Sequence, residues 1–217
     1  MRKVLVAAFV SLDGVMQAPG GPAEDPTGGF RFGGWTAPYF DDSLGGAMGE
    51  MFSRPFDLLL GRKTYEIFAG HWPYAHDEIG ALFGAATKYV ATRNPDFEMT
   101  WENSVSLGAD PVAAIRELKA GDGPDLLTQG SADFLQTVFA NDLADEVQTL
   151  TFPVVLGGGN RLFQGAAAPG AWKMVGTVTS ASGVVVARYA RDGAVRTGDF
   201  QQAEPSAAEL ERRRKLT

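Results

Sequence analysis

Short apolar runs recur along the whole chain, separated from one another by segments with helical signals. The first run, residues 3–10, reads KVLVAAFV and lacks the polar alternation that marks a solvent-facing strand. It predicts a strand buried on both faces, near the centre of a sheet. Further strands are predicted at residues 56–60, 88–92, 103–107, 125–128, 146–155, 172–180 and 184–191.

Helical signals lie between these runs. They predict helices at residues 38–52, 64–69, 79–87, 111–120 and 132–141. Strands and helices alternate along most of the chain, which favours a mostly parallel sheet with helices on its faces. The last two strands are separated only by Ala-Ser-Gly, which predicts an antiparallel hairpin at one edge.

The 217 residues fit one domain, which we place at residues 1–195, followed by a polar tail at 196–217. One long irregular segment, residues 13–38, is rich in Gly and Pro yet carries Met16, Phe30, Phe32 and Trp35. A long loop with aromatic side chains is typical of a lid over a binding site. The alternative is a mobile surface loop.

Composition excludes several classes of function. The chain has no cysteine and two histidines, so thiolate chemistry and cysteine-based metal sites are excluded and we expect no metal. A net charge of -7 argues against a nucleic-acid surface. No apolar run approaches the about 20 residues of a membrane span, and no signal peptide is evident, so we expect a soluble cytoplasmic protein.

Three predicted strand ends carry groups that suit phosphate. Gly61-Arg62-Lys63-Thr64 joins a strand to a helix, and Gly130-Ser131-Ala132 repeats this arrangement. Thr92-Arg93-Asn94 places a hydroxyl and a guanidinium at a third strand end, which suits the 2′-phosphate of NADPH. Each motif alone also fits a turn, a cap or a solvated helix start. Because all three follow apolar strands in an acidic chain, together they favour a nucleotide site at the carboxyl ends of the strands.

Four segments carry a family resemblance: residues 4–15, with Ser11-Leu12-Asp13-Gly14-Val15; residues 58–66 (LLLGRKTYE); residues 127–135; and residues 153–163. In this order they resemble the dihydrofolate reductase superfamily. The closer likeness is to the reductase domain of the bifunctional riboflavin deaminase-reductase and its free-standing relatives. The resemblance implies a three-layer α/β/α reductase, usually a homodimer, that uses NADPH to reduce a small heterocycle such as 5-amino-6-(5-phosphoribosylamino)uracil.

The resemblance also implies roles for individual residues. Ala7, Gly14 and Val15 would line the nicotinamide side, and Trp35 would lie near the cofactor. The phosphates of NADPH would be held by residues from the three strand ends, namely Gly61, Arg62, Lys63 and Thr64, then Thr92 and Arg93, then Gly130, Ser131, Ala132, Asp133 and Leu135. The chain departs from the family in having Gln129-Gly130 where dihydrofolate reductases have a Gly-Gly pair.

Reduction also needs a proton source. Asp41 is our candidate proton relay, with Asp42 as its substitute, because both follow the lid. The alternative role for either carboxylate is to stabilise the N-terminus of a helix. Lys, Tyr or water could also deliver the proton.

Three hypotheses follow for the function. The first is an NADPH-dependent reductase of a small heterocycle. A dihydrofolate reductase is an alternative form of this first hypothesis. The second hypothesis is a nucleotide- or flavin-binding module on the same fold that has no catalytic turnover. The third is a dimeric scaffold without a ligand.

Overall fold

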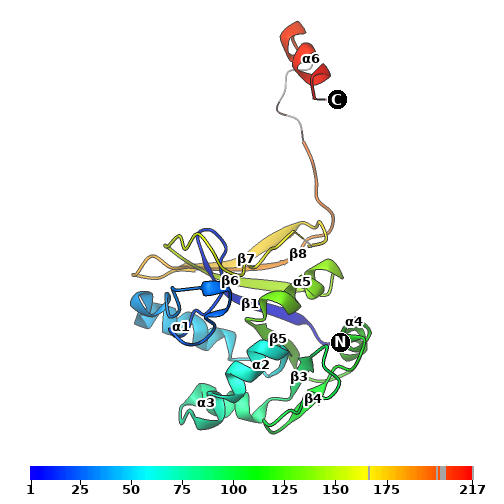
Figure 1. Ribbon diagram of the computed structural model, residues 1–217. Coiled ribbons are helices and arrows are strands. Elements are labelled where there is room, and N and C mark those ends of the chain that lie inside the picture. Colours follow the sequence, from blue (N-terminus) through cyan, green and yellow to red (C-terminus); the bar gives the residue numbers. More distant parts are fainter. Residues whose placement is uncertain (166, 199, 201–203, 217) are drawn as a thin grey trace.

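The computed structural model describes residues 1–165, 167–198, 200 and 204–216. Its eight strands form one sheet in the order β4-β3-β2-β5-β1-β6-β8-β7 (Figure 1). The strands are β1 (Val4–Ser11), β2 (Phe56–Gly61), β3 (Lys88–Ala91), β4 (Ser104–Ser106), β5 (Asp125–Gln129), β6 (Glu146–Phe152), β7 (Trp172–Thr179) and β8 (Val185–Arg191). All neighbours from β4 to β6 pair in parallel, whereas β8 pairs antiparallel with both β6 and β7.

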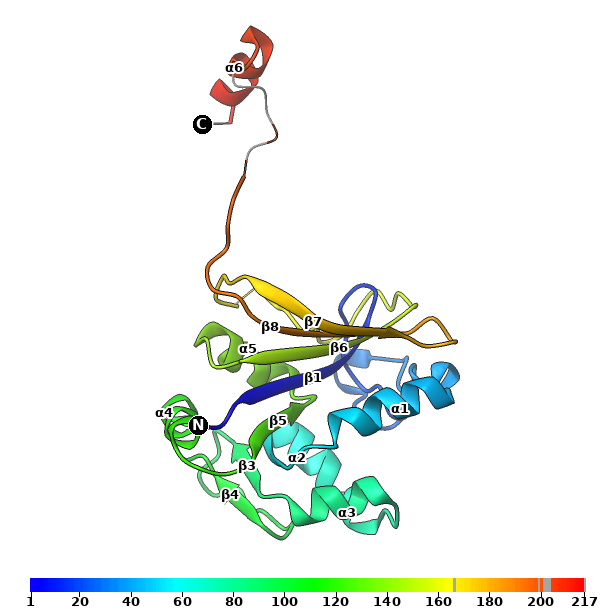
Figure 2. The same cartoon turned by 180° about the vertical axis from the view of Figure 1, so that it is seen from behind.

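Helices cover both faces of the sheet (Figures 1 and 2). The α-helices are α1 (Asp42–Met51), α2 (Arg62–Ala69), α3 (Glu78–Ala85), α4 (Pro111–Ala120), α5 (Ala132–Ala140) and α6 (Ala207–Arg214). Short 3-10 turns are η1 (Thr27–Gly29), η2 (Ala37–Tyr39) and η3 (Trp72–Tyr74). One apolar cluster joins the sheet to α4 and α5, and a second joins its other face to α1, α2 and α3.

The central strand β1 explains the two clusters. Val4, Val6 and Ala8 belong to the cluster with α4 and α5, while Leu5 and Ala7 pack into the opposite one. Successive side chains of a strand point to opposite faces, so an unbroken apolar run is what a strand covered on both faces requires. The predicted three-layer α/β/α class, with a mostly parallel sheet and an antiparallel C-terminal hairpin, is confirmed.

Two predicted boundaries differ most from the structure, and the others shift by at most two residues. The first helix begins at Asp42 rather than at residue 38, because Pro38 lies in the separate turn η2 and Asp41 has an extended backbone. Strand β6 ends at Phe152, immediately before Pro153, because proline has no N–H for the ladder.

The polar tail contains helix α6, which lies apart from the sheet in both views (Figures 1 and 2). Part of this predicted tail, residues 199, 201–203 and 217, lies outside the described residues. Within the described part of the chain, no helix combines the length and apolarity needed to cross a membrane.

Candidate functional site

A cavity of about 1600 Å³ opens at the carboxyl ends of the parallel strands. Gly61 pairs with Ala91, and Ala7 pairs with Gln129, so the ends of β2, β3 and β5 lie at one edge of the sheet. The lid residues 16–25 form a wall of the cavity, and residues after β2, β3 and β5 form another. The three motifs that the sequence singled out therefore meet in one place.

Two helix N-termini meet at this cavity, and they touch. The Gly61 N–H, at the start of α2, donates to the Ser131 Oγ, at the start of α5, over 2.9 Å. A Cβ on Gly61 would lie 2.9 Å from the Cβ of Phe134, so only glycine permits this approach. Ser131 itself takes the left-handed conformation (φ 65°), as does Gly130 (φ 81°).

These two helices differ from the other described α-helices in how they begin. Asp41, Asp77, Asp110 and Ser206 each cap their own helix with a side-chain hydrogen bond, at α1, α3, α4 and α6. Neither α2 nor α5 has a side-chain cap. The first N–H groups of a helix have no partner within it, and they carry the positive end of the helix dipole. The starts of α2 and α5 therefore bring uncapped N–H donors and the positive ends of two helix dipoles to one place.

Three cations lie among the residues that line the cavity: Arg62, Lys63 and Arg93. Arg62 pairs with Glu66 (3.1 Å) on the exposed side of α2, and Arg93 is exposed after β3. Lys63 instead reaches the lid, where its Nζ lies 3.2 Å from the Asp25 Oδ2 and 3.0 Å from the Thr27 Oγ1. The lid is thus tied to the start of α2 by an ion pair.

The lid also holds its own shape. The Gln17 Nε2 donates to the backbone oxygens of Asp25 (3.0 Å) and Thr27 (2.9 Å). The Trp35 Nε1 donates to the backbone oxygen of Gln17 over 2.8 Å. Burial alone would raise the pKa of Asp25, but hydrogen bonds from Thr27 and Lys63 outweigh it and the pKa is lowered. Lid residues 16–25 therefore form an ordered wall of the cavity.

The cavity lining includes most of the expected phosphate-binding residues, which come from all three strand ends. They are Gly61, Arg62, Lys63, Thr64, Thr92, Arg93, Gly130, Ser131, Ala132 and Asp133. Five other expected cofactor residues are outside this lining, namely Ala7, Gly14, Val15, Trp35 and Leu135. Four of these have buried side chains that pack in the core clusters, Ala7, Val15, Trp35 and Leu135. Gly14 lies in the turn after β1, at φ 78°.

Asp41, our expected proton relay, has a structural role instead. Its Oδ1 accepts from the Ser43 Oγ (2.6 Å) and the Leu44 N–H (2.8 Å), and its Oδ2 accepts from the Ser182 N–H (2.8 Å). These hydrogen bonds, from Ser43 first, hold the pKa of the carboxyl well below its usual range. Asp41 is not part of the cavity lining. We therefore remove Asp41 from the proposed chemistry and assign it to the cap of α1.

Sequence reasoning missed the lid's polar residues in the cavity: Gln17, Glu24 and Asp25. The Glu24 Oε2 accepts from the N–H groups of Gly20 (2.5 Å) and Gly21 (3.2 Å). Burial nevertheless raises the pKa of this carboxyl, because removal from water disfavours its charged form. The chain offers a weak signal for these residues, since polar side chains in a Gly- and Pro-rich loop are also typical of plain surface.

No metal centre is evident at the site. Across the described ranges, no three His, Asp or Glu side chains gather in a way that could hold a metal ion.

Comparisons with known proteins agree with this architecture. A family model described as the RibD C-terminal domain matches residues 2–186. A curated relative is the uncharacterized protein YyaP of Bacillus subtilis (strain 168), 26% identical over 201 residues that cover 88% of this chain and 96% of YyaP.

Two solved structures share the fold. One is dihydrofolate reductase from Enterococcus faecalis, complexed with NADP(H) and RAB-propyl, with a TM-score of 0.57 at 13% identity over 88% of this chain and 96% of that one. A diaminohydroxyphosphoribosylaminopyrimidine deaminase/5-amino-6-(5-phosphoribosylamino)uracil reductase from Thermotoga maritima gives 0.58 at 17% identity, over 88% of this chain and 57% of that one. The fold is therefore dihydrofolate reductase-like.

Proposed function

We propose that this chain, which belongs to the RibD C-terminal domain family, is an NADPH-dependent reductase of a small heterocyclic substrate. The family and its structural relatives support a reductase-type function on this fold. The cofactor and the class of substrate are our proposal.

The observation that carries the proposal is the pair of uncapped helix N-termini. The first-turn N–H groups of α2 and α5 lack side-chain acceptors, and the two helices touch through Gly61 and Ser131. A pyrophosphate has acceptor oxygens on both phosphorus atoms and a negative charge that both helix dipoles favour. The donor set therefore fits the middle of a dinucleotide.

The left-handed Gly130 supports the same fit. A Cβ at this position would lie 3.3 Å from the Thr64 Cγ2, so a side chain would crowd the space between the two helix starts. Arg62 and Lys63 would add charge-assisted bonds to the phosphates, and the Thr64 hydroxyl lies on the first turn of α2. Lys63 would have to leave Asp25 or be shared with it, which couples the lid to the phosphate site.

When bound, NADPH would supply a hydride to the substrate. The chain itself would bind the phosphates at α2 and α5, hold the lid over the cavity through Lys63 and Asp25, and exclude water with the apolar residues of the lid and α1. Arg93, exposed at the end of β3 on the cavity wall, is the residue we assign to the 2′-phosphate.

The proposal is tested by titrating the chain with NADPH and NADH while following tryptophan fluorescence, and then by assaying NADPH oxidation with pyrimidines, pterins, flavins and quinones. We expect saturable binding with NADPH preferred and turnover with at least one heterocycle. Absence of NADPH binding at millimolar concentration would overturn the proposal. Tight binding without turnover of any compound would instead support a nucleotide-binding module.

A further inference from the structure

The side chain of Gln17, in the lid, joins three segments of the chain. The residue is 6% exposed, and its Nε2 donates to the backbone oxygens of Asp25 (3.0 Å) and Thr27 (2.9 Å). Its Oε1 accepts from the Asn160 N–H over 3.0 Å. The amide therefore uses both its donor nitrogen and its acceptor oxygen, and it holds the later part of the lid at a fixed place relative to the loop after β6.

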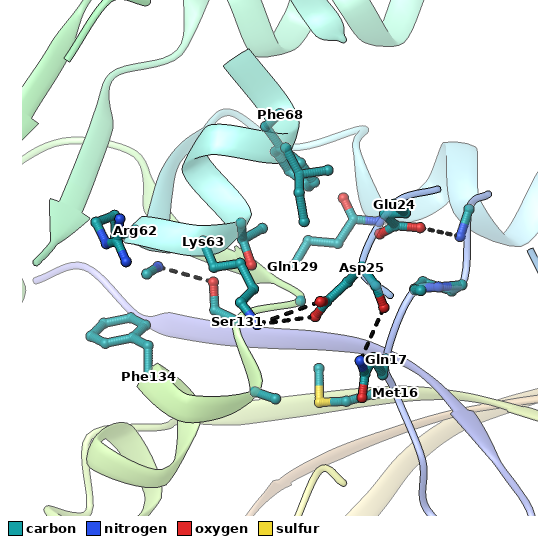
Figure 3. A pocket seen from close by; sticks show the side chains of 18 of the residues that line it. Met16, Gln17, Glu24, Asp25, Arg62, Lys63, Phe68, Gln129, Ser131 and Phe134 are labelled. Carbon is teal, nitrogen blue, oxygen red and sulfur yellow. Dashed lines mark hydrogen bonds and ion pairs between the residues drawn. The ribbon is translucent and has the colours of Figure 1, made fainter. Parts of the chain in front are cut away.

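Asp25 passes this position on to Lys63. The Lys63 Nζ lies 3.2 Å from the Asp25 Oδ2 and 3.0 Å from the Thr27 Oγ1. The Asp25 carboxylate is itself held, because its Oδ1 accepts from the Thr27 hydroxyl (2.5 Å) and from the Thr27 N–H (3.2 Å). Figure 3 shows Gln17, Asp25 and Lys63 connected in this order. A chain of contacts therefore leads from a buried lid amide to the first turn of α2.

These contacts fix a side chain that is otherwise flexible. The Lys63 side chain is half exposed and carries its ammonium on a four-carbon stem, which loses rotamer entropy when the ammonium is held in one place. Asp25 and Thr27 hold it before any ligand arrives, so this entropy is not lost on binding. An ammonium has three N–H donors, and two of them point to Asp25 and Thr27. The third remains for a ligand at the uncapped start of α2.

We propose that Gln17 is a positioning residue for cofactor binding. By fixing Asp25 and Thr27 it places the Lys63 ammonium where a phosphate group of the cofactor binds, without contacting that phosphate itself. The inference rests on the proposed function, and it makes the lid one of the determinants of affinity at the start of α2.

Only a side chain with the hydrogen-bonding groups of glutamine fits this place. Two carbonyl oxygens need a donor and one N–H needs an acceptor, and an amide of this length supplies all three bonds. Next to it the Met16 N–H donates to the Asn160 oxygen over 2.8 Å, which anchors the base of the lid to the same loop. Because buried backbone groups left without partners are costly, removal of the amide displaces Asp25 and Thr27 from this anchor.

A plain brace of the lid is the competing explanation for Gln17, and the two roles differ in what they predict. A brace supports every ligand contact of the cavity equally, so its loss weakens binding whether or not Lys63 is present. A residue that acts through Lys63 has no effect once the ammonium is gone. A double-mutant cycle with Lys63 therefore separates the two roles.

The experiment is isothermal titration of the full chain with NADPH. Gln17→Met keeps the length of the side chain without its hydrogen bonds, and we expect it to weaken NADPH binding about tenfold. In a Lys63→Met background the same change should alter the affinity less than about twofold. In an Arg93→Ala background it should still weaken binding about tenfold, because Arg93 lies after β3 and outside these lid contacts.

Gln164→Met is the matched control. Gln164 is an exposed glutamine whose Nε2 also donates to a backbone oxygen, that of Arg161, in the loop after β6. It does not line the cavity, so this variant should bind NADPH as wild type does.

A second variant keeps the test independent of the buried substitution. Thr27 is exposed, and Thr27→Val removes only the hydroxyl that accepts from Lys63 and donates to Asp25. We expect it to weaken NADPH binding about threefold, and to have no effect in the Lys63→Met background. Melting temperatures identify any variant that fails to fold, and if Gln17→Met is one of them the Thr27 cycle decides.

Equal weakening by Gln17→Met in the wild-type and Lys63→Met backgrounds would overturn the inference, as would wild-type affinity in both Gln17→Met and Thr27→Val. These outcomes need a wild type that binds NADPH, and they leave the cofactor proposal standing. A wild type that does not bind NADPH would overturn the proposed function and this inference with it.

Discussion

At the scale of single residues, Asp41 offers a test of assigned roles. Its three hydrogen bonds cap α1 and tie it to the turn between β7 and β8. We expect Asp41→Ala to lower Tm by roughly 2–4 °C, as loss of an N-cap does in a chain of this size, without a change in substrate turnover. Asp42→Ala is the control, because Asp42 lies in the first turn without a cap role, and it should move Tm less. A large loss of turnover with unchanged Tm would return Asp41 to the mechanism.

The contribution of Asp41 to the stability of the fold also depends on pH. Because its folded pKa is lowered, the carboxylate stabilises the fold fully above the unfolded value of 3.8, and this stabilisation is lost as pH falls below that value. The difference in Tm between wild type and Asp41→Ala should therefore shrink on acidification.

Arg93 tests the choice of cofactor. Because only NADPH carries the 2′-phosphate, Arg93→Ala should weaken the binding of NADPH by about tenfold or more. The affinity for NADH should stay nearly unchanged. Fluorescence titration with both nucleotides measures this. Arg116→Ala, an exposed arginine on α4, is the control. Equal weakening of both nucleotides would remove Arg93 from the 2′-phosphate site.

At this scale the sequence predicted side chains next to strand ends better than side chains within the lid. Arg62, Lys63 and Arg93 line the cavity as expected because their neighbouring strands and glycines fix where they lie, and their binding roles remain predictions. Glu24 and Asp25 depend on contacts made across the fold, such as the ion pair from Asp25 to Lys63, and no local pattern encodes such a contact.

At the scale of elements, the contact between α2 and α5 depends on the absence of a Cβ at Gly61. A Cβ on Gly61 would press against the Phe134 Cβ at 2.9 Å, which forces the two helix starts apart. We expect Gly61→Ala to weaken the binding of NADPH at least about tenfold. The same change should lower the free energy of unfolding by about 1–3 kcal/mol. Gly84→Ala is the matched control, because its Cβ would meet nothing within 4 Å inside α3, and it should be neutral or stabilising. If Gly61→Ala bound NADPH as wild type does, the two helix starts would not act together.

Strands and helices themselves were predictable because their signals are local. The run at β1 shows burial on both faces without any knowledge of its neighbours. The order β4-β3-β2-β5-β1-β6-β8-β7 is different, since strand neighbours far apart in the chain are chosen by packing of the whole sheet. The absence of a side-chain cap on α5 could not be predicted from the sequence either. Ser131 is a residue type that commonly caps helices, but in the fold its Oγ accepts from the Gly61 N–H instead.

At the scale of the whole molecule, the edge strand β7 supports the homodimer that the resemblance implies. Met174, Val175 and Val178 are about half exposed along it. An exposed apolar edge strand is typical of an interface. We expect a dimer by light scattering after gel filtration, which Val178→Glu converts to a monomer. Val105→Glu, on the opposite edge strand β4, is the control and should remain a dimer. A monomeric wild type would contradict this expectation.

We propose that two uncapped helix N-termini and Arg93 hold NADPH at the carboxyl edge of the sheet. A crystal structure of the chain with NADPH would show where each phosphate group lies. We predict the pyrophosphate against the first N–H groups of α2 and α5, and the 2′-phosphate within hydrogen-bond distance of Arg93. NADPH bound elsewhere, or with its phosphates away from both helix starts, would show that these helices do not form the phosphate site.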